Sequence, residues 1–250
     1  MKILILDIET FPNLAYVWGM YEQNVIKFKQ QTCIASYVYK WLDEKKVYGV
    51  SLPDFSGYKP GSYDDKKLVQ SLWPLLDAAD VVVAHNGQSF DVKVIQGRFL
   101  AHDIKPPSPF QQVDTKLAVK KVSRFNSNKL DDLGELFGLG KKIKTDFGLW
   151  LGCINGDKKA WANMMKYNKQ DVLLLEKLYL RLLPWISSHP NRSLFENRPV
   201  CPKCGSKKLQ KAGTRRCVTR SYTRYRCSDC GGWSQATKSL PGGAEIKNAY

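Results

Sequence analysis

Four of the seven cysteines form two C-x-x-C pairs near the C-terminal end of the 250-residue chain. The pairs are Cys201/Cys204 and Cys227/Cys230, and residues 205–226 separate them. A glycine follows each pair and lets the backbone turn tightly around the sulfur atoms. Four thiolates at this spacing suit a closed tetrahedral Zn²⁺ site. The sequence therefore predicts a small domain over residues 196–238 that holds one structural zinc ion.

The segment between the cysteine pairs is rich in arginine and aromatic residues. From Asn197 onward the chain holds 12 Lys/Arg and 2 Asp/Glu, so most of the formal net charge of +16 lies in the last fifth. A module this small needs metal binding to fold, and it resembles a zinc ribbon. Its surface predicts contacts with nucleic-acid phosphates and bases, whereas binding a protein partner is the alternative use. The arginines expected to bind substrate are Arg215, Arg216, Arg220 and Arg224.

The chain as a whole has the composition of a folded globular protein. Of the whole chain, 43% is hydrophobic and 25% is charged, and no apolar run approaches the roughly 18 residues of a membrane helix. The apolar opening at residues 1–6 is short and is followed by acidic residues, so it predicts a buried strand rather than a signal peptide. We therefore expect a cytoplasmic protein that does not bind membranes. Residues 239–250 are expected to form a flexible tail.

Hydrophobic patterning predicts strands first, and then strands that alternate with helices. Strands are predicted at 2–6, within 14–20, 24–30, 33–42 and 45–52, and at 81–86. Helices are predicted at 64–79, 89–100, 130–139 and 161–183, with a strand-to-helix step near 112–121. Pro74 is expected to kink or end the first of these helices. This order of elements fits an α/β domain with a mixed sheet over residues 1–195.

Three acidic motifs occur in order along this domain. Asp7-Ile8-Glu9 ends the first strand, where alternation points both carboxylates to one face. Two adjacent carboxylates repel each other unless protons or a cation neutralise them. Asp91 falls near a predicted helix start, and Tyr167 and Asp171 share one face of the last helix. Taken singly, these motifs also fit an exposed turn, a helix cap and a surface aspartate.

Together, D-x-E after the first strand, N-x-x-x-F-D after a middle strand and Y-x-x-x-D on a late helix form an ordered set. This set resembles the DEDD superfamily of 3′→5′ exonucleases, which have a ribonuclease H-like fold. Tyr167, in place of histidine, matches the DEDDy branch of proofreading type. Asp114-Thr115 and the segment KLDDLGELFGLGKK also look like the surroundings of that family's third motif. The resemblance covers roughly residues 1–190.

The resemblance implies a two-metal-ion mechanism with two Mg²⁺ or Mn²⁺ ions held by Asp7, Glu9, Asp91 and Asp171. In the family's arrangement Asp7 would bridge both ions, and Asp91 would hold one of them. Glu9 and Asp171 would hold the ion that binds the attacking water. Two such ions stabilise both the attacking and the leaving oxygen. Tyr167 would orient the water, since a phenol with a pKa of about 10 is a poor base at neutral pH.

The resemblance also implies a pocket for the terminal nucleotide. Asn86 and Phe90 would lie near that nucleotide, although Phe90 fits a core position equally well. The backbone of Thr10 and Phe11 would line the pocket for the 3′ end. His85 is expected to be a hydrogen-bonded histidine at the end of a strand rather than a metal ligand.

We therefore expect a metal-dependent 3′→5′ exonuclease that acts on single-stranded nucleic acid, with DNA favoured. A 3′→5′ exoribonuclease is one alternative, because discrimination of the sugar depends on contacts to the 2′-OH. A non-catalytic nucleic-acid-binding adaptor is another, and the presence of all four carboxylates argues against it. The compact chain and its basic module fit an accessory nuclease of a phage or a bacterium.

Overall fold

The computed structural model describes residues 1–21 and 24–247. Contacts divide the chain into two compact units, Lys2–Tyr179 and Leu180–Tyr250, with Met1 joining the second. The predicted domain boundary at residues 195/196 lies within the second unit and remains a prediction. Of the predicted tail, residues 248–250 lie outside the described part of the chain. No helix in the described ranges combines the length and the apolar character that a membrane crossing requires.

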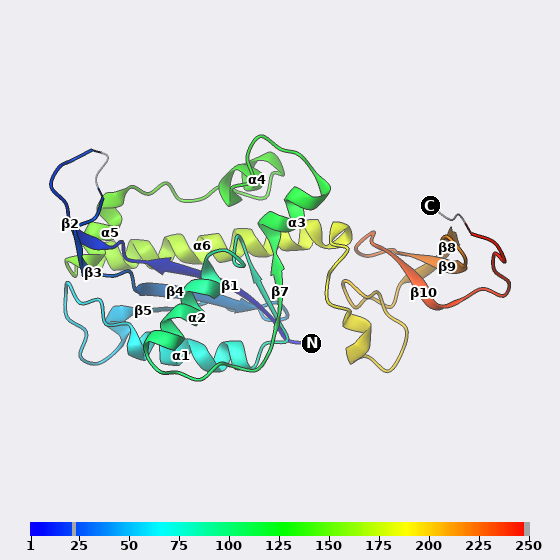
Figure 1. The fold of residues 1–250 in the computed structure, drawn as a ribbon, viewed down its shortest axis with the longest axis horizontal. Helices are drawn as coiled ribbons and strands as arrows, with labels where there is room; N and C mark the ends of the chain where they lie inside the picture. Colours follow the sequence, from blue (N-terminus) through cyan, green and yellow to red (C-terminus); the bar gives the residue numbers. More distant parts are fainter. Residues whose placement is uncertain (22–23, 248–250) are drawn as a thin grey trace. The chain divides into compact units, whose positions relative to one another are not determined.

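The first unit is built on a five-stranded mixed sheet (Figure 1). Its central strand, β1 (Ile3–Thr10), pairs antiparallel with β4 (Ile34–Trp41) and parallel with β6 (Val81–Ala84). The edges are β5 (Tyr48–Ser51) beside β4 and β7 (Gln111–Asp114) beside β6. A separate hairpin, β2 (Leu14–Tyr16) and β3 (Lys27–Gln30), follows β1.

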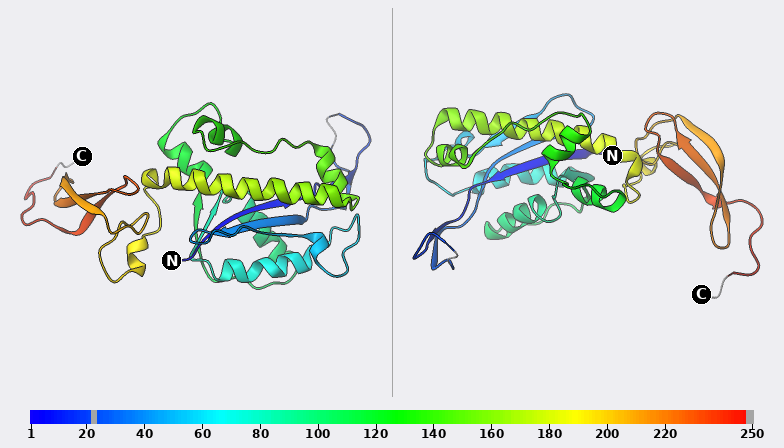
Figure 2. Two further views of the ribbon diagram at one scale, coloured as in Figure 1. Left: turned by 180° about the vertical axis from the view of Figure 1, so that it is seen from behind. Right: turned by 90° about the horizontal axis from the view of Figure 1, so that it is seen from above.

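Helices cover both faces of this sheet. α6 (Lys158–Leu182) runs along one face, while α1 (Lys66–Asp77) and α2 (Asp91–Ala101) cover the other (Figures 1 and 2). The shorter helices are α3 (Thr115–Val122), α4 (Leu130–Leu136) and α5 (Phe147–Ile154). Single 3₁₀ turns occur at Leu52–Asp54, Leu183–Trp185 and Arg192–Phe195. The prediction of an α/β mixed sheet flanked by helices is confirmed.

Side chains alternate along β1, and both faces of this strand are buried near its start, with Ile3 and Ile5 on the face opposite to Leu4 and Leu6. Leu4, Leu6 and Ile8 are buried and join the main hydrophobic core with side chains of α1 and α2. Full burial of each such aliphatic side chain stabilises the fold by about 1.5–3 kcal/mol. Asp7 and Glu9 must therefore point to the opposite face, along which α6 runs.

Three local predictions differ from the observed elements. The strands predicted within 14–20 and 24–30 are shorter in the structure, where only β2 and β3 form and pair with each other. α1 continues past Pro74 to Asp77, because the buried Leu72 and Leu76 hold the turns on either side of the missing N–H. α5 was not predicted, although Asp146 caps its first turn by accepting a hydrogen bond from the Gly148 backbone N–H.

The second unit contains a three-stranded antiparallel sheet with the strand order β10-β9-β8. Its strands are β8 (Leu209–Arg216), β9 (Ser221–Cys227) and β10 (Trp233–Ser239). One cysteine pair lies before β8 and the other lies where β9 ends, so the sheet brings the two pairs together. The predicted small zinc-ribbon fold agrees with this arrangement.

Candidate active site

The C-terminal end of β1 supplies the first two acidic side chains. Asp7 and Glu9 flank Ile8, which is only 3% exposed and anchors the strand in the core. The register between β1 and β4 shifts between Glu9 and Thr10, which bends the strand just beyond the acidic pair. Such irregularities re-aim side chains near functional sites.

α6 brings a second set of polar side chains to the same place. Asp171 and Asn168 are almost completely buried, and they lie on the helix with Tyr167. The Asn168 side-chain amide donates to Asp7 Oδ2, and its carbonyl oxygen accepts from the Ser36 hydroxyl at 3.4 Å. Asn168 therefore fixes the position of Asp7 relative to α6.

Three of the four predicted carboxylates form one cluster. Ligand oxygens of Asp7, Glu9 and Asp171 all lie within 4.8 Å of one another. Asp91, the first residue of α2, lies outside this group of three but adjoins it, because its Oδ1 accepts from the Ile8 N–H at 3.2 Å. Its charge also contributes to the electrostatics of Asp7. The structure thus gathers all four predicted acids at one end of β1.

The cluster holds its protons more tightly than isolated carboxyl groups do. Burial, and then the charges of Asp91, Glu9 and Asp171, raise the pKa of Asp7 well above its ordinary value. Burial and the charge of Asp171 raise the pKa of Glu9 to about 8, and burial raises that of Asp91 to about 6. Ionising the whole group therefore requires a compensating positive charge.

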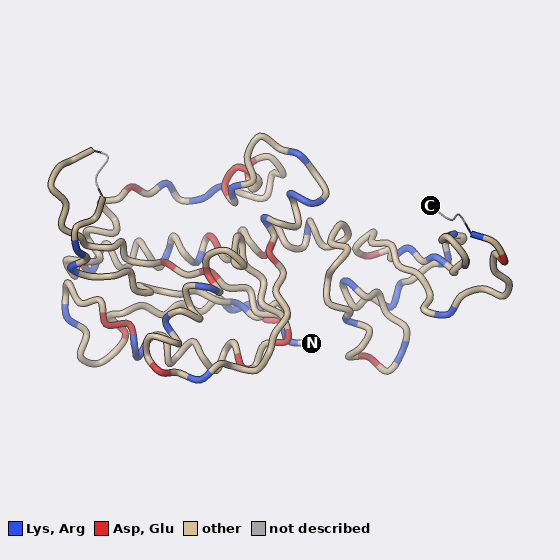
Figure 3. The backbone as a smooth tube through the Cα atoms, viewed as in Figure 1, with Lys and Arg blue, Asp and Glu red and all other residues tan. Residues whose placement is uncertain are grey.

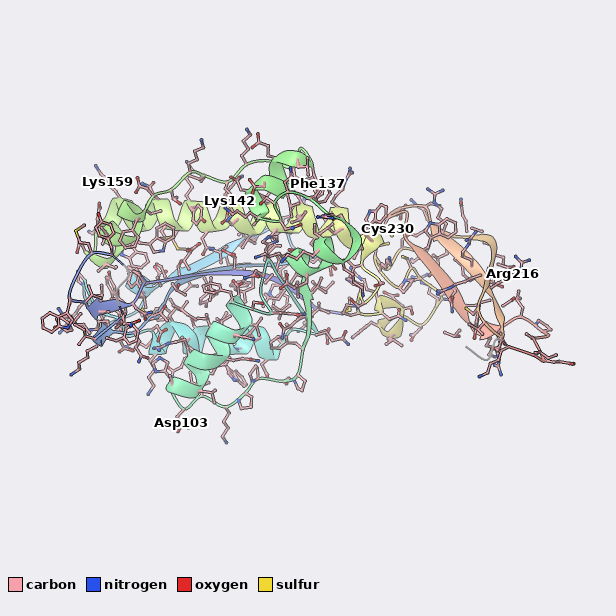
Figure 4. The ribbon with its side chains drawn as sticks, turned by 45° about the horizontal axis from the view of Figure 1, so that its top comes forward. Asp103, Phe137, Lys142, Lys159, Arg216 and Cys230 are labelled. Carbon is pink, nitrogen blue, oxygen red and sulfur yellow. The ribbon has the colours of Figure 1, made fainter. Side chains whose placement is uncertain are left out.

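Lys142 supplies one such charge, and sequence reasoning missed it. The ammonium of Lys142, which is labelled in Figure 4, forms a salt bridge with Asp171 Oδ2 and lies 3.4 Å from the Tyr167 hydroxyl. Burial lowers the pKa of Lys142, but the charges of Asp171, Asp7 and Glu9 outweigh burial and raise it. The lysine-rich loop at 141–144 was visible in the sequence, but nothing in its spacing pointed to the acidic residues.

The donor set fits a divalent cation. The ligands are carboxylate oxygens, which hard ions such as Mg²⁺ and Mn²⁺ prefer. Asp171 Oδ1 is buried and has no hydrogen-bond partner in the described part of the chain. A buried anionic oxygen without a partner is costly, and a cation would satisfy it. Asp7, Glu9 and Asp171 would hold the ion, with Asp91 beside them.

The residues predicted to line the nucleotide pocket differ in their accessibility. Phe90 is 40% exposed at the start of α2, so it is not a core residue. Asn86 adopts a left-handed conformation with φ of 75°, and its side-chain oxygen accepts from Lys116 Nζ at 3.2 Å. Thr10 is partly exposed, whereas the Phe11 side chain is buried against Tyr63. Phe11 therefore offers only its backbone to a ligand.

His85 has a structural role, as expected from the sequence. Its Nδ1 lies 2.9 Å from the Thr115 hydroxyl, and its Nε2 lies 2.9 Å from the Asn128 carbonyl oxygen. Burial lowers its pKa to about 4, which keeps the ring neutral at physiological pH. Both ring nitrogens are therefore engaged in hydrogen bonds, which connect the end of β6 to Thr115 and Asn128 in the segments after β7.

An open groove of about 470 Å³ lies between the loop that carries Lys142 and helices α5 and α6. Asn163 lines it, and this residue lies one helical turn before Tyr167 on the same face of α6. Its lining is mixed in charge, because the exposed lysines Lys144, Lys159 and Lys166 lie with Asp146 and Asp157. None of the four predicted acids at the end of β1 lines the groove.

The four predicted zinc ligands converge in the second unit. Cys201 Sγ lies 3.7 Å from Cys230 Sγ, and Cys204 Sγ lies 3.6 Å from Cys227 Sγ. Sulfurs bound at about 2.3 Å to a tetrahedral zinc ion lie about 3.8 Å apart, so the spacing fits Zn²⁺. The glycine after each pair has a positive φ, 75° at Gly205 and 74° at Gly231, as the tight turns require.

The predicted substrate-binding arginines do not share one surface. Arg215 and Arg224 lie on the same face of the three-stranded sheet, because Arg215 and Tyr222 are partners and Tyr222 precedes Arg224 by two residues. Arg216 follows Arg215 directly and points to the other face. Arg220 lies in the turn between β8 and β9, where its carbonyl oxygen accepts from the Cys217 N–H.

Comparison with known proteins gives the family. A model of the RNase H superfamily matches residues 42–183, which is more than half of the chain. The chain belongs to the RNase H superfamily. A comparison with curated proteins gave no match.

This RNase H superfamily protein shares its fold with a solved structure. That structure is the family B DNA polymerase from the hyperthermophilic archaeon Pyrobaculum calidifontis, with a TM-score of 0.55 and 18% sequence identity. The similarity covers 73% of this chain and 24% of the polymerase chain, so this protein spans about a quarter of the polymerase's length. The predicted ribonuclease H-like nuclease fold is confirmed. The family match begins after Asp7 and Glu9 and does not cover them, and the site geometry links these two residues to Asp171.

Proposed function

We propose that this protein is a metal-dependent 3′→5′ exonuclease of DEDDy type that acts on single-stranded nucleic acid, with DNA favoured. The observation that carries the proposal is the carboxylate cluster of Asp7, Glu9 and Asp171, with Tyr167 one helical turn from Asp171. The order of its motifs along the chain supports the 3′→5′ polarity through the resemblance to the DEDD superfamily. Two C-x-x-C pairs arranged for a metal rather than for disulfides suit a reducing cytoplasm.

The protein's own groups would position the scissile phosphodiester and the attacking water. Divalent cations at the cluster would neutralise the carboxylates and stabilise charge on the attacking and leaving oxygens. Asn168 holds Asp7 in place for this task. Burial, followed by the charge of Asp171, raises the pKa of Tyr167, so its phenol stays protonated and orients water by a hydrogen bond. Lys142 brings positive charge to the phosphate.

Labelled oligonucleotides test this proposal directly. With a 5′ label and Mg²⁺ or Mn²⁺, we expect a ladder of progressively shorter products from single-stranded DNA. Comparison with RNA of the same sequence separates the favoured deoxyribonuclease from the alternative exoribonuclease. If both substrates stay intact with either metal but still bind in a salt-sensitive manner, the adaptor function replaces the nuclease.

Tyr167→Phe is expected to slow cleavage by about 10-fold to 100-fold. The change removes one hydrogen bond to the reacting water, and hydrogen bonds to charged or reacting groups contribute about 1.5–3 kcal/mol. Single-turnover rates with excess enzyme measure this effect. Tyr48→Phe is the matched control, since Tyr48 lies on edge strand β5. A wild-type rate for Tyr167→Phe would remove Tyr167 from the mechanism.

Lys142→Met is expected to slow cleavage about 10-fold at saturating metal, because a positive charge beside the developing anion is lost. Lys141→Met is the matched control. Lys141 is the neighbouring residue, but it is exposed and pairs with Glu135 instead. Equal cleavage rates for the two variants would show that the charge of Lys142 does not affect the reaction. A cleavage rate in Lys142→Arg between those of Lys142→Met and the wild type would support a role for the positive charge.

A further inference from the structure

One face of the three-stranded sheet in the second unit is markedly more exposed than the other. Along β9 and β10, exposed residues alternate with half-buried ones. Strand pairing puts Arg226 beside Trp233 and Arg224 beside Gln235, so these residues share a face. The exposed residues of this face include Gln210, Arg215, Arg224, Arg226, Trp233 and Gln235, and the half-buried Tyr222 lies on the same face.

The arginines of this face have no acidic neighbours on the sheet. None of the three strands contains an aspartate or a glutamate. Figure 3 shows Lys and Arg along these strands in blue. The groups that accept hydrogen bonds from the arginines are neutral: Arg215 donates to Gln235 at 3.0 Å, and Arg224 donates to the Ala212 carbonyl at 2.9 Å. The positive charge of the face is therefore not neutralised within the sheet.

Trp233 lies among these arginines and remains 47% exposed. The Arg224 guanidinium sits 4.4 Å from the centre of its ring, and that of Arg226 sits 5.9 Å away. These cation–π contacts hold the ring in a fixed orientation on the sheet. A fixed, half-exposed aromatic ring surrounded by guanidinium groups provides both a stacking platform and phosphate ligands.

We infer that this face binds single-stranded nucleic acid, with phosphates on Arg215 and Arg226 and a base stacked on Trp233. A single strand fits because its bases are free to leave their stack, whereas duplex bases are covered on both sides. The inference goes beyond the proposed cleavage and does not depend on it. Binding of a protein partner at this face is the outcome that would replace it.

Binding of a fluorescent single-stranded oligonucleotide by the full-length chain tests the inference, with Asp7→Ala present to prevent cleavage. Arg226→Gln is expected to weaken binding about 5-fold and to lower the slope of log K against log salt by about 0.7. Arg216→Gln removes the same charge from the opposite face and is the matched control, expected within about 2-fold of the parent. Equal losses in both variants would show that net charge, not this face, drives binding.

The stacking contact has its own pair of variants. Trp233→Ala is expected to weaken binding about 10-fold, and Trp233→Phe, which keeps a ring, to remain within about 2-fold. An oligonucleotide without bases should bind the Trp233→Ala variant and the parent protein with equal affinity, because it has no base to stack on the ring. Zinc content confirms that each variant keeps its fold. Equal affinity in all these variants, or no oligonucleotide binding at all, would overturn the inference even if the nuclease cleaves. Binding at this face without cleavage would instead count against the nuclease alone.

Discussion

Replacing Asp171 with asparagine is expected to lower the rate of strand shortening about 10³-fold without unfolding the protein. Asp171 is almost completely buried within the carboxylate cluster, and asparagine has the same shape but cannot carry the charge that holds a cation. Metal ions contribute several kcal/mol to the stabilisation of such transition states, and each 1.36 kcal/mol is a factor of ten in rate. Single-turnover cleavage in Mg²⁺ measures the loss.

Asp103→Asn is the matched control for this substitution. Asp103 is an exposed carboxylate with a φ of 55°, which asparagine also tolerates, and it is labelled in Figure 4. We expect this variant to cleave at the wild-type rate and both variants to keep the parental circular dichroism spectrum. A wild-type rate in Asp171→Asn would mean that Asp171 is not a metal ligand.

Cys201→Ser is expected to abolish stoichiometric zinc binding and to unfold the sheet of the second unit. Structural zinc contributes about 10–16 kcal/mol of binding free energy in small cysteine modules, and that energy is also folding energy. The loss should appear as less than one zinc per chain by elemental analysis and as rapid proteolysis between residues 200 and 240. The first unit should keep its own unfolding transition, since its core does not include these residues.

Cys217→Ser provides the comparison for this second experiment. Cys217 is exposed and lies outside the four-cysteine cluster, so its variant should retain one zinc ion and resist protease. If Cys201→Ser keeps full zinc content, or if Cys217→Ser loses it, then the ligand set is different from the one that the structure brings together.

Features that depend on local periodicity could be predicted from the sequence. The alternation of β1 places Asp7 and Glu9 on one face, as expected, because side-chain direction along a strand repeats every two residues. The short spacing within each cysteine pair similarly determines its turn. α5 carried a local signal as well, in the capping residue Asp146, but its eight residues were too short for a clear helical period.

Contacts between distant segments could not be predicted in the same way. Lys142 contacts Asp171 from a loop 29 residues earlier in the sequence, and Asn168 contacts Asp7 over a separation of 161 residues. No periodicity in the sequence relates residues so far apart. The ribbon shows a different limitation. Grouping Arg215 with Arg216 by charge overlooked that neighbouring residues on a strand point to opposite faces, which the strand alternation already implied.

A structure with Mn²⁺ and a short single-stranded oligonucleotide tests the nuclease proposal most directly. We predict anomalous scattering peaks among the carboxylates of Asp7, Glu9, Asp91 and Asp171, with the 3′-terminal phosphodiester beside them and Lys142 directed toward it. Mn²⁺ bound elsewhere, with the Lys142–Asp171 salt bridge intact and no nucleic acid at the end of β1, would contradict it.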